Sequence, residues 1–76
     1  MPDAALSNRV RECRVQEGLR FKELAELAEI SEATLRKLEG GDESITEVTK
    51  YKVLNAFNSL ERRLRDYTYG YLYPSG

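Results

Sequence analysis

The side chains that could act on a ligand in this chain are arginines and lysines on predicted helices. Nucleophiles paired with a histidine base are absent. Histidine is absent, and cysteine occurs once, as Cys13. Ser–His and Cys–His nucleophiles are therefore excluded, as is a zinc site built from Cys and His ligands. Arg36 and Lys37 instead fall in a short helical segment. Because such side chains donate hydrogen bonds to a ligand, the residues favour binding over catalysis, and we expect no enzyme, no metal and no cofactor.

These cations belong to the second of two short and closely joined helices. Apolar and small residues on one face predict a first helix over 21–29. Ser31 is a suitable N-cap for a second helix over 31–40, which two glycines end. A junction this short forces a steep crossing, which projects the second helix outward. The exposed positions of that helix would be Glu32, Ala33, Arg36, Lys37 and Gly40.

Further helices are predicted on both sides of this pair. Leu6, Val10 and Cys13 share one face of a helix over 4–17, in which Cys13 is a core residue rather than a reactive thiol. Ser44–Glu47 fits a capping box at the start of the next helix. Apolar residues then recur at 4-3-4 spacing, at Val53, Phe57, Leu60 and Leu64. A break at Asn58-Ser59 would make 60–66 a separate fifth helix.

The last stretch of the chain carries tyrosines at every second position, which is typical of an extended segment. These are Tyr67, Tyr69, Tyr71 and Tyr73. Tyrosine is common at interfaces, so one hypothesis is that the tail pairs with a second protomer or another protein partner. The other is that the tail folds back over its own helices and covers a small core.

Length and composition limit the chain to one small domain. It has 76 residues, 41% of them hydrophobic and 33% charged, with a formal net charge of −1. We expect a helical body over 1–66 and a tail over 67–76. The sequence contains no apolar run long enough to cross a membrane and no secretion signal, and its single cysteine is typical of a reducing cytoplasm. Any affinity for nucleic acid must come from one local face, because the net charge is not basic.

From about Leu6 to Leu60, the chain resembles the phage-repressor (Cro/XRE-like) helix-turn-helix family. The residues that carry the resemblance are Asn8–Arg14, Gly18-Leu19, Glu23–Ala28, Ile30–Glu39, Gly41 and Lys52–Phe57. The resemblance implies an all-α, compact four- to five-helix domain of the lambda-repressor type, with the helix-turn-helix motif at about 20–40. It also implies a bacterial or phage-encoded protein that binds double-stranded DNA as a homodimer.

Carried over residue by residue, the resemblance implies a set of DNA-contacting positions. Ser31 would cap the recognition helix, and the residues around Phe21 would lie beside the DNA backbone. Residues after Gly40 would approach a phosphate through main-chain N–H groups. The full set is Arg20, Phe21, Lys22, Ser31, Glu32, Ala33, Thr34, Arg36, Lys37 and Gly40.

Three departures from the family pattern affect this expectation. Arg20-Phe21 stands where members usually carry a small hydroxyl residue and a glutamine, so the usual phosphate contact is altered. Glu29 stands in place of a turn glycine and must be accommodated there. Asp42 and Glu43 replace basic residues and would repel a phosphate. A lower affinity for DNA, or a tilted approach, is expected.

Several charged residues have both a structural and a functional interpretation. Glu32 would accept a hydrogen bond from a cytosine amino group, or would simply favour the helix N-terminus and pair with Arg36. Arg62, Arg63 and Arg65 would form a second phosphate patch or a solvated face.

Two functions follow from these observations. The first is a sequence-specific transcriptional regulator, a repressor that occupies operator DNA. The second is a protein-interaction module, an antitoxin or assembly adaptor, that keeps the fold with little DNA binding. The acidic 42–47 region and an exposed Phe21 and Leu27 would favour the second.

Overall fold

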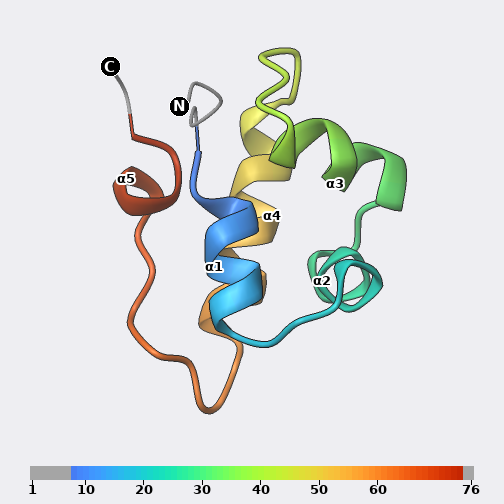
Figure 1. Ribbon diagram of the computed structural model, residues 1–76. Coiled ribbons are helices and arrows are strands. Elements are labelled where there is room, and N and C mark those ends of the chain that lie inside the picture. The colour runs from blue at the N-terminus through green and yellow to red at the C-terminus, as the bar shows by residue number, and fades with distance from the viewer. Residues whose placement is uncertain (1–7, 75–76) are drawn as a thin grey trace.

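The computed structural model describes residues 8–74 and contains five helices in that range (Figure 1). They are α1 (Val10–Gln16), α2 (Phe21–Ala28), α3 (Glu32–Glu39), α4 (Glu47–Asn58) and α5 (Tyr69–Leu72). The all-α fold class is confirmed. Among the described residues, none of the helices has the length and apolar character that a membrane crossing requires.

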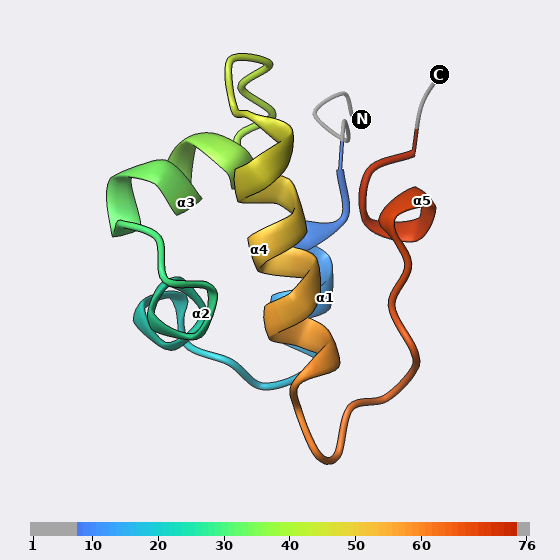
Figure 2. The same ribbon diagram turned by 180° about the vertical axis from the view of Figure 1, so that it is seen from behind.

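The longest helix, α4, lies at the centre of the fold. α2 packs against α4 and α3, and α1 contacts α3. In both views α1 overlaps α4, α2 and α3 lie on one side of these two helices, and α5 lies on the other side (Figures 1 and 2). The molecule measures 30 × 24 × 20 Å. This arrangement leaves one face of α3 without a neighbouring helix.

One apolar core holds the helices together. The predicted inward residues of the helix pair, Leu24, Leu35 and Leu38, are at most 1% exposed. Cys13 is fully buried, and burial raises the pKa of its thiol to about 11, so it is an unreactive core residue as predicted. The other core residues are Val10, Ala25, Ala28, Val53, Leu54, Ala56, Phe57, Tyr67, Leu72 and Tyr73.

The first three helices end with the same backbone device. After each, a residue with positive φ closes the last turn, as in a Schellman motif. Two of these residues are glycines, Gly18 (φ 74°) and Gly41 (φ 83°), but the third is Glu29, with φ 59° and ψ 43°. The N–H groups of Glu29 and Ile30 donate to the carbonyl oxygens of Glu26 and Ala25. The turn of the motif therefore accommodates a side chain where glycine is favoured.

We expect Glu29→Gly to raise the free energy of unfolding by about 0.5–1 kcal/mol, because the left-handed conformation disfavours a Cβ atom. Glu29→Ala keeps the Cβ atom and is expected to give no such gain. Urea unfolding of the three proteins measures the difference. Equal stability of the Gly and Ala variants would contradict the explanation.

Two predicted helix starts were wrong, because side-chain hydrogen bonds hold the preceding residues out of the helix. Residues 4–7 of the first predicted helix lie outside the described residues, as does Leu6. Asn8 and Arg9 are not helical, because the Asn8 Oδ1 atom accepts from the N–H of Val10 at 3.1 Å. The capping box at Ser44 is also wrong. Ser44 donates its N–H to Asp42, and Thr46 is the N-cap of α4.

The predicted fifth helix over 60–66 does not form. The Asn58 side chain bonds both the N–H and the carbonyl oxygen of Tyr67, at 2.9 Å each, and so closes a loop in its place. Glu17 accepts from the N–H of Leu64 at 2.8 Å. Leu64 is 68% exposed, so its assignment to the apolar stripe is wrong. Contacts distant in sequence therefore override the local apolar spacing.

The tyrosine tail is not extended, so the predicted extended conformation of residues 67–76 is wrong. Thr68 caps a single helical turn. The rings of Tyr69 and Tyr73, at its start and just after its end, contact each other at a tilt, with centroids 4.9 Å apart. Tyr67 and Tyr73 are 4% and 7% exposed and belong to the core of their own chain. Tyr69 and Tyr71 remain partly exposed. The tail thus folds back over its own helices, the second of the two hypotheses.

Candidate nucleic-acid interface

α3 presents a polar face to solvent. The residues Glu32, Ala33, Arg36, Lys37 and Gly40 are all exposed, as the helical spacing predicted. Ser31 caps the helix by accepting from the N–H of Thr34 at 3.0 Å. Because its hydroxyl also donates to that of Thr34, at 2.8 Å, both groups serve the helix terminus in this structure.

The C-terminal end of α3 is fixed to the body of the domain. Arg14 on α1 holds Glu39 through two hydrogen bonds, of 2.7 and 3.3 Å, and both side chains are nearly buried. Asn8 donates to the carbonyl oxygen of Leu38 at 2.7 Å. The exposed face is therefore carried by a helix that is anchored at its C-terminal end.

The start of α2 lies beside α3. Arg20 and Lys22 are exposed, and Glu23 accepts from the N–H of Arg20 at 2.7 Å. Phe21 is partly buried, and its ring centroid lies 5.5 Å from the guanidinium carbon of Arg36. The ion pairs within residues 8–74 are Arg14–Glu39 and Arg63–Asp66, so Arg36 does not form the predicted pair with Glu32.

The first main-chain N–H groups after α3 are bonded within the protein. The N–H groups of Gly40, Gly41 and Asp42 donate to carbonyl oxygens of α3. Ser44 donates its N–H to Asp42, and its hydrogen bonds lower the pKa of the Asp42 carboxyl group. Asp42 is therefore ionised at neutral pH, and the loop repels phosphate. The phosphate contact expected of residues after Gly40 stays a prediction, which these internal hydrogen bonds and the Asp42 charge oppose.

The arginines after α4 have mainly structural roles. Arg63 donates to the carbonyl oxygens of Asn58 and Leu60 and pairs with Asp66 at 2.9 Å. Arg65 lies over the ring of Tyr71, 3.8 Å from its centroid. This loop lies at the far end of the molecule from α3 (Figure 1). Arg62, the third arginine of the predicted patch, is exposed, and its side chain forms no hydrogen bond or ion pair within residues 8–74.

Sequence reasoning missed two arginines of α1 that lie close to this face. Arg11 and Arg14 line a hollow of about 330 Å³ together with Phe21, Arg36, Glu39 and Gly40. Their i, i+3 spacing placed them on one side of α1, but nothing in the sequence indicated that this side adjoins α3.

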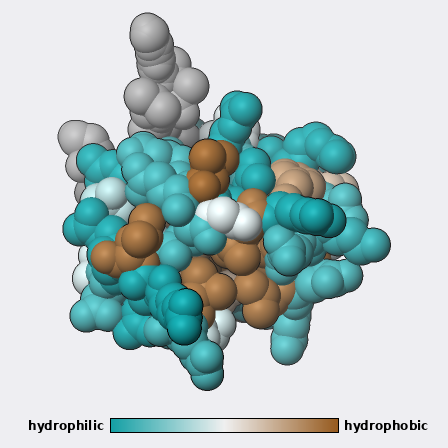
Figure 3. Space-filling model, turned by 60° about the horizontal axis from the view of Figure 1, so that its bottom comes forward, coloured by the Kyte–Doolittle hydropathy of each residue, from teal (hydrophilic) through white to brown (hydrophobic). Residues whose placement is uncertain are grey.

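Apolar side chains gather at another part of the surface, where α1 ends and the chain leaves α4 (Figure 3). Val15 is 62% exposed and Leu27 45% exposed. Leu19 and Leu60 are partly buried and continue the core toward this surface. Leu27 is exposed as predicted, and this apolar end is the feature of the surface that most favours a protein contact.

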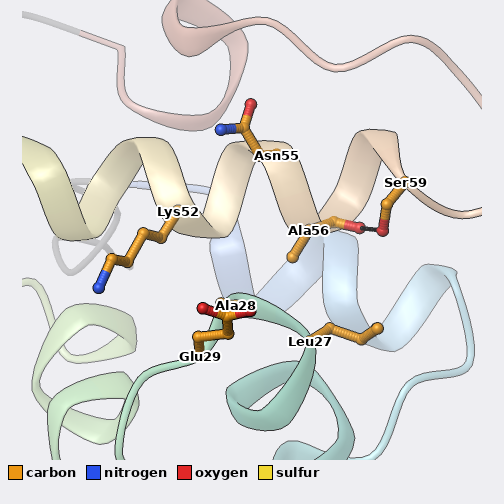
Figure 4. Close-up of a pocket in the computed structure, with 7 residues that line it drawn as sticks. All are labelled: Leu27, Ala28, Glu29, Lys52, Asn55, Ala56 and Ser59. Carbon is orange, nitrogen blue, oxygen red and sulfur yellow. Dashed lines mark hydrogen bonds between the residues drawn. The ribbon is translucent and has the colours of Figure 1, made fainter.

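A second hollow of about 330 Å³ lies between α2 and α4 (Figure 4). Leu27 and Glu29 line it from the α2 side, and Lys52 and Asn55 from α4. The Ser59 hydroxyl at its end already donates to the carbonyl oxygen of Ala56 at 2.6 Å. Within residues 8–74, no three Cys, Asp or Glu side chains gather in a way that could hold a metal ion.

Two short helices that meet at a left-handed turn, with the second helix exposed, define a helix-turn-helix unit, a class of DNA-binding domain. A model of the helix-turn-helix domain family matches residues 5–57. The chain therefore belongs to the helix-turn-helix domain family. Comparison with curated proteins gave no match, and neither did comparison with solved structures.

Proposed function

We propose that this protein is a transcriptional repressor of the phage-repressor type, which occupies operator DNA through α3. The observation that supports this most directly is the exposed polar face of α3, a helix whose C-terminal end is anchored by the Arg14–Glu39 pair. An α-helix fits the major groove, and the N-terminal residues of a recognition helix contact base edges. Glu32, Ala33 and Lys37 would make these contacts, with Arg20 and Lys22 beside the backbone.

We further propose that the protein binds DNA as a homodimer. A two-fold dimer places its recognition helices about 34 Å apart, one turn of B-DNA, and binds a palindromic site. In a dimer mediated by the tail, the contact would involve Tyr69 and Tyr71, because Tyr67 and Tyr73 are buried in their own chain. The apolar end around Val15 and Leu27 is the alternative contact surface.

The test is selection of bound duplexes from a randomised pool at about 50 mM and then about 200 mM salt, since purely electrostatic binding falls steeply over this range. We expect enrichment of a two-fold symmetric sequence. Lys37→Ala should weaken binding to the selected duplex by about 1–3 kcal/mol and should weaken binding to random DNA by less. Arg62→Ala removes the same charge far from α3 and serves as the control.

The second candidate function is a protein-interaction module that retains the helix-turn-helix fold. The exposed apolar side chains of Val15, Leu27 and Leu64 favour it, together with the net charge of −1. A randomised pool in which no sequence is enriched at either salt concentration would contradict the repressor proposal and support this one.

A further inference from the structure

An aromatic ring lies close to two guanidinium groups at the edge of the α3 face. The ring is that of Phe21, the first residue of α2, and its centroid lies 5.5 Å from the guanidinium carbons of both Arg14 and Arg36. Both distances allow attraction between the cation and the π face of the ring. The ring therefore connects a buried arginine with an exposed one.

The two arginines differ in how their charge is compensated. Arg14 is bound to Glu39 through two hydrogen bonds and donates a third to the carbonyl oxygen of Leu19 at 3.2 Å. Its position is therefore fixed and its charge neutralised. Arg36 is exposed, and neither ion pair formed within residues 8–74 includes it. Its charge is available to a ligand while the ring limits where its side chain can lie.

A second uncompensated cation lines the same hollow of about 330 Å³. It is Arg11 on α1, which is also exposed. A guanidinium group presents several N–H donors in a plane, a geometry that fits the oxygen atoms of a phosphate. The hollow adjoins α3 at the start of α2, on the side where the first helix of such a motif crosses the DNA backbone. A phosphodiester of duplex DNA is the anion that this position would meet.

We propose that Phe21 is a positioning residue, which holds Arg36 beside Arg11 so that both guanidinium groups bind one backbone phosphate of duplex DNA. This inference rests on the proposed DNA binding and adds a division of roles within α3. Arg36 fixes the helix on the backbone, and base readout is left to Glu32, Ala33 and Lys37. The aromatic ring thereby replaces the polar residue expected at this position.

The experiment compares affinity for the selected duplex and for a random duplex of the same length, over a range of salt concentrations. We expect Arg36→Ala and Arg11→Ala each to weaken both complexes by a similar factor. Each should also reduce the slope of log K against log salt by about 1, as loss of a phosphate contact does. Phe21→Leu, which keeps an apolar side chain, should weaken both complexes by about two- to fivefold. Phe21→Tyr retains the π face and should bind like the original protein.

A double-mutant cycle separates positioning from a general structural role. Phe21→Leu should have little further effect once Arg36 is alanine, and its full effect in the Arg62→Ala background. All binding is measured below the thermal transition of each variant, so that loss of fold is not counted. A Phe21→Leu effect that is unchanged by Arg36→Ala would overturn the inference, as would a loss confined to the selected duplex in Arg36→Ala. Absence of DNA binding by the original protein would reject the proposed function and this inference together.

Discussion

Deletion of residues 67–76 is expected to unfold the domain rather than to free a dimer arm. The deletion removes Tyr67, Leu72 and Tyr73 from the core, where each is less than a tenth exposed. Truncation of one buried leucine or aromatic residue costs about 2–5 kcal/mol. Three such losses total about 6–15 kcal/mol, which is comparable to or larger than the free energy of unfolding of about 4–11 kcal/mol for a domain of this length. Circular dichroism of the truncated protein should show loss of helix at 25 °C.

A single substitution tests whether the tail is part of the core without shortening the chain. Leu72→Ala should lower the free energy of unfolding by about 2–5 kcal/mol, because Leu72 is fully buried. Leu64→Ala removes the same atoms from a side chain that is 68% exposed and should change stability by less than about 0.5 kcal/mol. If the truncated protein keeps its helix content and its oligomeric mass changes instead, the tail is an interface and not part of the core.

Arg14→Met is expected to destabilise the domain by about 3 kcal/mol. It leaves the Glu39 carboxylate, whose side chain is 9% exposed, without its cation. Removal of one partner from a nearly buried pair is costly, because the remaining charge stays desolvated. Because methionine retains much of the packing volume of arginine, the decrease in the free energy of unfolding reflects the loss of the Arg14 charge and its hydrogen bonds. Urea unfolding provides the measurement.

The matched control for this prediction is Arg62→Met, since Arg62 is exposed. The control should change stability by less than about 0.5 kcal/mol. Equal effects of the two substitutions would show that the Arg14–Glu39 pair behaves as a surface ion pair. Arg14→Met should also weaken DNA binding, because the pair anchors α3 and supports the ring of Phe21.

The helix pair could be predicted from sequence because its signals are local. These signals are the apolar spacing, the Ser31 cap and the glycines that follow α3. Each lies inside a helix or directly beside its end. The exposed face of α3 followed from the same spacing. Glu29 was identified correctly as a residue that the turn must accommodate, and its positive φ agrees with that.

The predictions that were wrong concern residues whose contacts lie far away in the sequence. Nothing near Leu64 indicates that Glu17, 47 positions earlier, accepts its N–H. The alternating tyrosines predicted an extended tail, but a Thr68 cap and burial against the core favour a helical turn instead. From the sequence, Phe21 was interpreted only as the loss of a phosphate contact, because no local pattern indicates the two arginines beside its ring.

The contact between Arg9 and α5 has a consequence for the order in which the domain folds. The N–H of Arg9 donates to the carbonyl oxygen of Leu72 at 2.8 Å, and the Arg9 guanidinium donates to that of Tyr71 at 2.8 Å. Almost the entire chain must therefore be closed into one loop before the core is complete. During synthesis, α2 and α3 emerge from the ribosome long before the residues that cover α1 and α4. The nascent helix-turn-helix unit is thus unable to reach its final stability until Tyr73 has left the exit tunnel.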